Sequence, residues 1–308
     1  MRICVTGGCG YKGSVLVPKL LAAGHHVTVI DPQWFGNHLE QHPHLVVSPG
    51  DCGRYFVGTD AVIHLAGVAN DPCGELDPKL AWESNVLATA RMAEVHARAG
   101  VPQFIYASSA SVYGFHEGAD VTEDTRLLPI SDYNKTKMCA ERILLSYSDK
   151  MAIQIVRPAT VCGWSPRMRL DVLVNMLTME ALKNGTVHLR NPGLHRPNVH
   201  IEDITDLYIW LLERPEHTGI YNAGFENYTI REVAAMVARR TGASVTEAHS
   251  TTDQRSYRLN SEKILSLGFR PQRTVLNAID ELIAKYNAGQ LQDKDEWYSL
   301  RMMPRKAA

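Results

Sequence analysis

The sequence has no excess of charge of either sign, no long apolar run and no close pair of cysteines. Its 32 lysines and arginines stand against 33 aspartates and glutamates, for a formal net charge of -1. No overall field therefore draws the chain to nucleic acid or to an anionic membrane surface. No apolar stretch approaches the roughly 18 residues that a membrane-spanning helix needs. We expect neither a nucleic-acid nor a membrane partner, and any anionic ligand must be bound by a local group of side chains.

Cysteine usage and the first residues point to a reducing compartment. The six cysteines include no Cys-x-x-Cys pair and are too sparse for a disulfide scaffold. Met1 to Thr6 run directly into glycines, without the apolar core and cleavage site of a secretory signal. The histidines lack cysteine or carboxylate companions at metal-ligand spacing. The prediction is a cytoplasmic protein without a metal site.

The composition is that of a globular protein, with 45% hydrophobic and 21% charged residues over 308 residues, which allows one large or two modest domains. Short apolar runs alternate with stretches of helical periodicity in the first half. The runs cover 2–6, 26–31, 45–48, 61–66, 103–108 and 152–158, and the helical stretches cover 15–23, about 80–99 and about 133–148. This alternation predicts an α/β fold with a doubly wound, mostly parallel sheet and helices on both faces.

The alternation breaks after Gly163. Helices are expected near 171–183, 204–213, 230–241 and 275–286, and strands near 187–190 and 199–201. We therefore expect a first domain over 1–163 and a smaller mixed α/β lobe over 164–292, with some chain returning to the first domain. Residues 293–308 are polar and are expected to form a loosely docked C-terminal tail.

A glycine-rich turn joins the first expected strand to the first helix, in the order Thr6-Gly7-Gly8-Cys9-Gly10-Tyr11-Lys12-Gly13. Glycines at this place let the backbone turn tightly and approach a pyrophosphate at the helix N-terminus. Asp31 ends the second strand, where a carboxylate can bind a ribose diol and would repel a 2′-phosphate. The first domain is therefore predicted to be a Rossmann-type domain that binds NAD rather than NADP.

Lys12 stands in the first turn of the expected helix. A cation there can reinforce the binding of a pyrophosphate, or it can be an ordinary solvated lysine. The sequence leaves both interpretations open.

Tyr133 and Lys137 lie one turn apart on the same face of an expected helix. A phenol with a pKa of about 10 is only about a thousandth ionised at neutral pH. A neighbouring ammonium group favours the phenolate and so makes the tyrosine a better base. Ser109, which follows the strand at 103–108, can hydrogen-bond the same substrate oxygen. These three residues are the predicted catalytic group.

The glycine turn, Ser109 and the Tyr133/Lys137 pair, in this order, resemble the extended short-chain dehydrogenase/reductase family, in particular its nucleotide-sugar epimerases and dehydratases. The resemblance extends over nearly the whole chain, through His64-Leu65-Ala66, Ser111-Val112-Tyr113-Gly114, Arg157-Pro158 and Tyr221-Asn222-Ala223-Gly224. The motif Ser165-Pro166-Arg167-Met168-Arg169 resembles a bacterial subgroup that acts on nucleotide-activated hexoses and heptoses.

This resemblance implies a set of ligand contacts and a homodimer. The implied NAD contacts are Gly7, Gly10, Tyr11, Lys12, Gly13, Asp31, Asp51, Cys52, Leu65, Ala66, Gly67, Ser108, Tyr133, Lys137 and Pro158. The implied contacts to the nucleotide-diphosphate sugar are Ser109, Ser111, Tyr133, Asn175, Arg196 and Arg255, because forked arginine donors suit a diphosphate. The implied dimer interface is formed by the helices near 80–99 and 133–148.

The residues after Ser109 bear on the reaction. Similar dehydratases carry an Asp-Glu pair there and similar decarboxylases a glutamate, whereas this chain has Ala110 and Ser111, which cannot move a carbon-bound proton. A C4 epimerase needs only the three catalytic residues and room for a 4-keto sugar to turn over. NAD-dependent C4 epimerisation of a nucleotide-diphosphate hexose or heptose is therefore the predicted activity.

Three alternatives stay open. The same scaffold can serve a C4 dehydrogenase or a 4-ketoreductase of a nucleotide sugar, and a chain that had lost its chemistry would be a non-catalytic NAD-binding sensor. Cys162 is either a small buried hydrophobic residue or an acid/base group for epimerisation at C3 or C5.

Overall fold

The computed structural model describes residues 1–50, 57–116, 120–248 and 256–306, with side chains described up to residue 303. Its largest sheet has seven strands in the order β11-β7-β5-β4-β1-β2-β3, and every pair is parallel. These strands are β1 (Arg2–Thr6), β2 (His26–Ile30), β3 (Leu45–Ser48), β4 (Ala61–His64), β5 (Gln103–Ala107), β7 (Ala152–Pro158) and β11 (Gly219–Ala223). The predicted Rossmann-type doubly wound sheet is confirmed.

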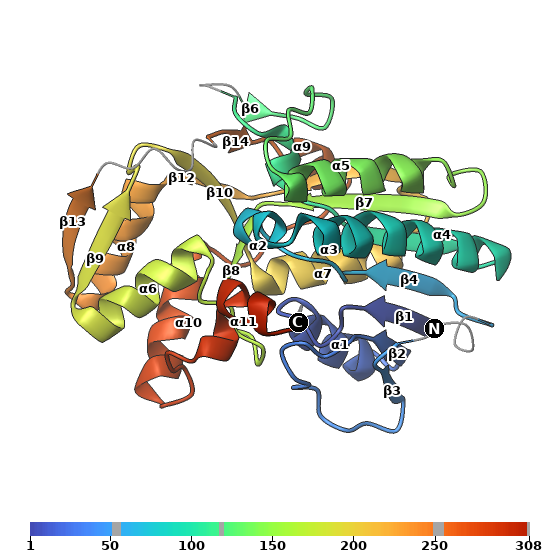
Figure 1. Cartoon of the computed structure of the whole chain (residues 1–308), viewed down its shortest axis with the longest axis horizontal. Coiled ribbons are helices and arrows are strands. Elements are labelled where there is room, and N and C mark those ends of the chain that lie inside the picture. Colours follow the sequence, from blue (N-terminus) through green and yellow to red (C-terminus); the bar gives the residue numbers. More distant parts are fainter. Residues whose placement is uncertain (51–56, 117–119, 249–255, 307–308) are drawn as a thin grey trace.

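Helices cover both faces of this sheet (Figure 1). One face carries α1 (Gly13–Ala22) and α7 (Ile201–Leu212), which pack on each other, and the other carries α4 (Ala88–Arg98) and α5 (Asp132–Leu145). Because both faces are covered, the central strands read as continuous apolar runs, and every residue of β5 is buried. The strand order reverses between β1 and β4, so a crevice opens at the carboxyl ends of these strands.

The smaller lobe lies beyond those carboxyl ends (Figure 1). Its helices α6 (Leu173–Asn184), α8 (Ile230–Thr241) and α10 (Val275–Asn287) pack together. Its sheets pair β8 (Thr160–Cys162), β10 (His195–His200) and β12 (Glu226–Thr229) in one and β9 (Thr186–Arg190) with β13 (Ser244–Ala248) in another. Further short elements are β6 (Asp120–Val121), β14 (Arg258–Leu259), α9 (Glu262–Ser266) and two 3-10 helices at Ala110–Tyr113 and Asp295–Trp297. None of the helices in the described ranges is both long enough and apolar enough to cross a bilayer.

The helix expected over about 80–99 is present as a continuous helical run over 78–98. It consists of α3 (Pro78–Trp82), a π-helical segment (Glu83–Leu87) and α4, and a separate short helix, α2 (Asp71–Leu76), precedes it. Asp77 separates α2 from α3 and caps the second of them by accepting the Leu80 N–H. The π segment places Asn85 in the interior, where its amide donates to Val68 O and Thr136 Oγ1. A widened turn of this kind re-aims one side chain within an otherwise regular helix.

The expectation of a loosely docked tail is wrong. Trp297 and Met303 are only 5% and 3% exposed, and helix α11 (Ser299–Lys306) packs against α2. The segment reads as polar because its apolar residues are separated by charged ones. Met303 is buried only because the chain forms α11 and places it in a cluster with Cys73 of α2.

Candidate active site

One cavity of about 1170 Å3 follows the carboxyl edge of the large sheet and extends under the smaller lobe. Residues after β1, β2, β4, β5 and β7 contribute to its wall, as the crevice of a doubly wound sheet requires. The expected site residues that line it are Gly7, Gly10, Tyr11, Lys12, Gly13, Asp31, Leu65, Ala66, Gly67, Ser108, Ser109, Ser111, Tyr133, Pro158 and Arg196.

Three expected site residues, Asp51, Cys52 and Arg255, lie outside the described residues. Two described ones are not part of this wall. Lys137 lies behind Tyr133. Asn175 is fully buried beneath the wall, where its Oδ1 accepts the Gly163 N–H (3.0 Å) and its Nδ2 donates to Tyr11 OH (3.0 Å) and to the Arg169 carbonyl (2.9 Å).

At two positions of the glycine turn, Gly7 and Gly13, the backbone leaves no room for a side chain. A Cβ on Gly7, whose φ is +70°, would lie 2.7 Å from the Ala66 nitrogen, and a Cβ on Gly13 would lie 2.4 Å from the Gly8 carbonyl oxygen. Helix α1 begins here, and no side chain caps its free N–H groups. The cavity therefore holds a helix N-terminus with open donors, the arrangement that binds a phosphate.

Asp31 is fixed at the same end of the cavity. Its Oδ2 accepts the Cys9 N–H (2.9 Å) and its Oδ1 accepts the Gln33 N–H (2.7 Å). Burial raises the pKa of Asp31, while these two N–H donors and the charge of Arg167 oppose the rise. Each carboxylate oxygen retains a lone pair, so the group can still accept the hydroxyls of a ribose.

Tyr133 and Lys137 come from the first turns of α5, which begins after Ser131, the residue whose hydroxyl accepts the Asn134 N–H (3.2 Å). The Lys137 ammonium donates to the Ala107 carbonyl (2.9 Å) and lies 6.0 Å from the centre of the Tyr133 ring. Burial lowers the pKa of Lys137 to about 8, and the charge of Glu141 opposes this effect. The ammonium is thus held at a fixed place beside the phenol, where it favours the phenolate.

The serine hydroxyls form a short chain beside Tyr133. Ser109 Oγ and Ser111 Oγ are 2.7 Å apart, and Ser111 donates to Asn134 Oδ1 (2.5 Å). Ser109 therefore has a neighbour that orients its hydroxyl. Helix α2 lies close to Tyr133 on its other side, because a Cβ on Gly74 would lie 2.9 Å from the Tyr133 Cβ.

The site residues predicted from the sequence did not include a buried ion pair that lies behind the predicted catalytic residues. Arg157 donates to Glu141 through Nε (2.9 Å) and Nη2 (2.7 Å), and Glu141 also accepts the Ser108 hydroxyl (2.5 Å). Arg157 Nη1 donates to Tyr113 OH (2.8 Å). The sequence signal was available, since Glu141 lies one turn beyond Lys137 on the same helix face as Tyr133.

Several cations gather around the cavity without an equal number of carboxylates. Burial, with the nearby charges of Lys137 and Arg169, lowers the pKa of Lys12 to about 7. Burial and the charge of Arg169 lower the pKa of Arg167 to about 10. Arg169 pairs with Asp171 (2.9 Å), but Arg169 Nη2 and Arg167 Nε have no hydrogen-bond partner among the described residues. Buried donors in this state fit an anionic ligand such as a diphosphate.

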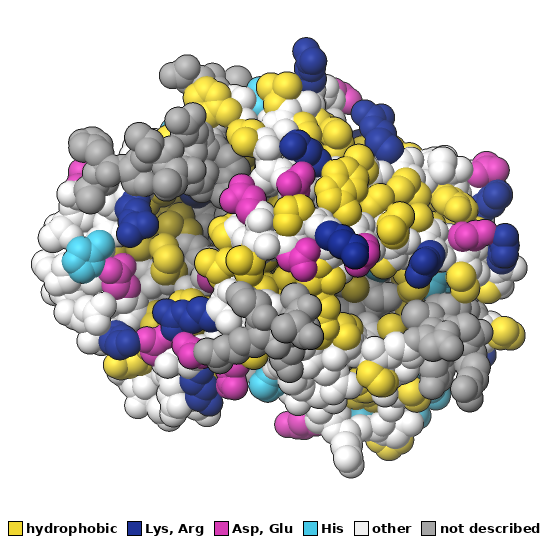
Figure 2. Space-filling model, viewed as in Figure 1, with side chains coloured by type: hydrophobic (Ala, Val, Ile, Leu, Met, Phe, Trp, Pro, Cys, Tyr) yellow, Lys and Arg dark blue, Asp and Glu magenta, His cyan; other side chains and the backbone are white. Residues whose placement is uncertain are grey.

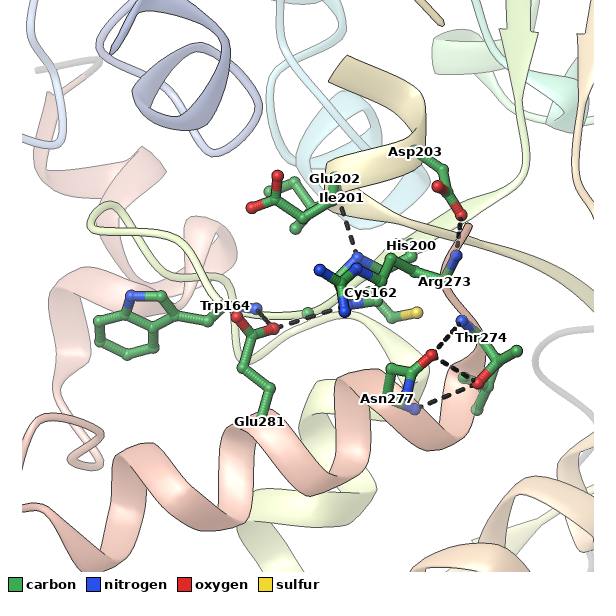
Figure 3. A network of polar contacts seen from close by, with 12 residues as sticks. Cys162, Trp164, His200, Ile201, Glu202, Asp203, Arg273, Thr274, Asn277 and Glu281 are labelled. Carbon is green, nitrogen blue, oxygen red and sulfur yellow. Dashed lines mark hydrogen bonds and ion pairs between the residues drawn. The ribbon is translucent and has the colours of Figure 1, made fainter. Parts of the chain in front are cut away.

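Cys162 lies away from this cavity. Figure 3 shows it beside a polar network in which Glu281 accepts the Trp164 N–H (3.0 Å) and approaches His200 Nε2 (3.6 Å). The thiol is fully buried, and its Sγ contacts the Val199 carbonyl oxygen (3.5 Å). Burial, with the charges of Glu226 and Glu281, raises the pKa of Cys162. The position of Cys162 supports the interpretation as a small buried hydrophobic residue rather than as an acid/base group.

The sequence and fold match known proteins. A model of the NAD-dependent epimerase/dehydratase family matches residues 3–224. The probable UDP-arabinose 4-epimerase 3 of Oryza sativa subsp. japonica is 27% identical over 286 residues, 79% of this chain and 70% of that protein. UDP-glucose 4-epimerase from Thermus thermophilus, solved with NAD, superposes with a TM-score of 0.81 at 26% identity, over 92% of this chain and 99% of that one. DesIV, a dTDP-glucose 4,6-dehydratase from Streptomyces venezuelae solved with NAD and TYD, superposes with a TM-score of 0.84 at 25% identity. The match covers 94% of this chain and 98% of that one.

The first prediction concerns the Glu141–Arg157 pair. Glu141→Gln leaves a buried guanidinium without its counter-charge, so the free energy of unfolding should fall by about 3–5 kcal/mol. Replacing both residues by methionine removes the unpaired charge and should recover most of that loss. Denaturant titration measures both changes, and a double variant as unstable as the single one would show that charge pairing is not the cause.

The second prediction concerns Lys12. Because its pKa is about 7, it is charged at low pH, and NAD should bind more weakly as the pH rises from about 6 to about 9. Lys12→Met should weaken binding about tenfold at the lower pH, the value of a hydrogen bond to a charged group, and should flatten the dependence.

Isothermal titration across this pH range measures the effect. Lys137 also titrates nearby, but it is present in both proteins, so the difference between them reports on Lys12. Lys135→Met, at an exposed position of α5, is the control. Equal affinities of wild type and Lys12→Met at every pH would mean that the Lys12 ammonium does not contribute to NAD binding.

Proposed function

Because this chain belongs to the NAD-dependent epimerase/dehydratase family, we propose that it interconverts the C4 epimers of a nucleotide-diphosphate sugar. Its relatives are UDP-sugar 4-epimerases, so UDP-hexoses and UDP-pentoses are the first substrates to test, followed by heptoses. The observation that carries the proposal is the cavity in which the glycine turn, Ser109 and Tyr133 share one wall.

The residues fit a dinucleotide. The Cβ-free turn at Gly7 and Gly13 and the open N-terminus of α1 suit the diphosphate, and the two free lone pairs of Asp31 suit a ribose diol. The unpartnered donors of Arg167 and Arg169 supply positive charge to the same cavity. NAD, when bound, supplies the acceptor and donor of the hydride at C4.

The chain's own residues handle the proton. Tyr133, as phenolate, takes the proton of the C4 hydroxyl and later returns it to the same oxygen. Lys137 keeps the phenolate favourable, and Ser109 hydrogen-bonds the oxygen as it becomes a carbonyl. Ala110 and Ser111 offer no acid/base group for proton transfer at C5. The chemistry available at this wall is therefore oxidation and reduction at C4.

The third prediction tests this activity. Incubation with a panel of UDP-sugars should yield the C4 epimer by NMR, without net reduction of NAD. Tyr133→Phe should reduce turnover by about 100- to 10,000-fold while still binding NAD. Tyr147→Phe removes a hydroxyl from a tyrosine outside the cavity and should have no effect.

Other outcomes favour the other functions. Stoichiometric NADH accumulation with an oxidised sugar would make the protein a C4 dehydrogenase, and consumption of NADH with a 4-keto sugar would make it a ketoreductase. A protein that binds NAD but converts no sugar from a panel of UDP, dTDP, GDP and ADP forms would be a non-catalytic NAD-binding sensor.

We also propose a homodimer formed through the α3–α5 face. Figure 2 shows hydrophobic side chains gathered over these helices. Leu87 at the end of the π-helical segment and Val95 in α4 are 54% and 38% exposed. Exposed apolar residues grouped on adjacent helices are typical of an interface.

The fourth prediction follows from this face. Sedimentation should give the mass of two chains for the wild type. Leu87→Asp should give the mass of one, because it places a charge in the apolar interface. Val46→Asp, at an exposed position of β3, should leave the mass unchanged. A wild-type mass near that of one chain would refute the dimer.

We propose that the protein is located in the reducing cytoplasm, because its described cysteines form no disulfide. All five described cysteines are free, and four of them are buried. Free, buried thiols are typical of proteins from reducing compartments.

A further inference from the structure

The C-terminal segment 297–303 lies beyond the residues matched by the family model and forms part of the cavity wall. It begins on the smaller lobe. Trp297 packs edge-on against Trp164, with ring centres 6.2 Å apart, and its carbonyl accepts the Leu170 N–H (2.8 Å). Trp297 is buried. The segment is therefore anchored at this end to the loop that carries Arg167 and Arg169.

The middle of the segment joins the charged residues of that loop. The Ser299 N–H donates to Asp171 Oδ2 (3.0 Å), and Arg167 Nη2 donates to Ser299 Oγ (3.2 Å). The Arg167 guanidinium also lies 3.8 Å from the centre of the Phe35 ring, in the loop that follows Asp31. Ser299 is thus hydrogen-bonded to Arg167, whose side chain reaches the Asp31 end of the cavity.

The far end of the segment crosses to the large domain. Met303 is buried in a cluster with Val68, Cys73 and Ala81, with Trp34 packed against it. Val68 follows β4 and Trp34 follows β2, so the cluster that contains Met303 brings together residues of both loops at the Asp31 end of the crevice. Figure 1 shows α11 in this bridging place, between α10 and the elements at the carboxyl edge of the large sheet.

We propose that segment 297–303 is the outer wall of the dinucleotide site over its Asp31 end, and that its opening sets the rate at which the cofactor leaves. This proposal rests on the proposed function only in taking NAD as the ligand. The segment is held at Trp297 by the smaller lobe and at Met303 by a contact with the large domain. A short helix gains little stability from its own hydrogen bonds, so the Met303 contact decides whether the wall is closed.

A slow exit matches the chemistry. An enzyme that returns the hydride to the same sugar regenerates its cofactor in each cycle and needs no exchange. A dehydrogenase must exchange its cofactor in every turnover and would be slowed by such a wall.

The fifth prediction is that weakening the Met303 contact speeds cofactor release. NADH is bound to each protein and chased with excess NAD, and the fluorescence decay gives the dissociation rate. Met303→Lys should raise this rate about tenfold, because most changes in affinity appear in the dissociation rate. Met302→Lys makes the same change on the neighbouring, less buried residue and should leave the rate within about twofold of wild type.

A second variant tests the opposite direction. Met303→Cys places a thiol in the cluster that contains Cys73. Oxidised glutathione can join the two as a disulfide and is itself reduced to two thiols. The joined protein should release NADH more slowly than the wild type, and dithiothreitol should restore the faster rate. Should the bond not form, the Met303→Lys and Met302→Lys pair decides by itself.

Equal NADH dissociation rates in wild type, Met303→Lys and cross-linked Met303→Cys would refute the proposal that segment 297–303 controls cofactor release. Loss of the fold in Met303→Lys would appear as a lowered melting temperature without NADH. In that case the release rate of cross-linked Met303→Cys tests whether the segment controls cofactor release. A wild type that binds no NADH would instead refute the proposed function, so the two failures are distinguishable.

Discussion

The ion pair between Glu141 and Arg157 is the interaction on which the wall with the predicted catalytic residues depends. It joins α5 to β7, accepts the Ser108 hydroxyl at the end of β5 and reaches Tyr113 through the guanidinium. Each of these elements carries or borders a residue of the predicted catalytic group. A buried pair adds little net stability compared with apolar packing. Its contribution here is geometric, because it fixes the separation between Ser109 and the Tyr133 helix.

The near-zero net charge conceals a local imbalance. Burial lowers the pKa of Lys12, Lys137 and Arg167, and nearby cations add to this effect at Lys12 (Lys137 and Arg169) and at Arg167 (Arg169). Asp171 balances only Arg169 directly. Assembling cations in a buried place is unfavourable until an anion enters. A dinucleotide or a sugar nucleotide would relieve this repulsion, which is one reason for a neutral protein to bind an anion tightly.

Much of the fold could be read from the sequence because the strands of a covered parallel sheet are uniform apolar runs. The observed β1, β3 and β7 have the expected bounds, and the glycine turn and the Tyr133/Lys137 pair lie where the pattern placed them. Local pattern failed where tertiary contacts decide. Helix α2, which Asp77 separates from α3, was not expected, and Met303 finds its apolar surroundings only in the folded chain. Asn175 was assigned to substrate by likeness, yet its amide is occupied by Gly163, Tyr11 and Arg169.

The bridging segment has a consequence for the order of assembly during synthesis. Residues 297–303 leave the ribosome after every other part of the cavity wall, and N-terminal parts of a chain generally fold first. The glycine turn, Asp31 and the catalytic helix can therefore be in place while this side of the crevice is still open. A cofactor that enters during this interval meets no barrier, and the later docking of Met303 then encloses it. Cofactor loading would in this way be part of biosynthesis rather than of the catalytic cycle.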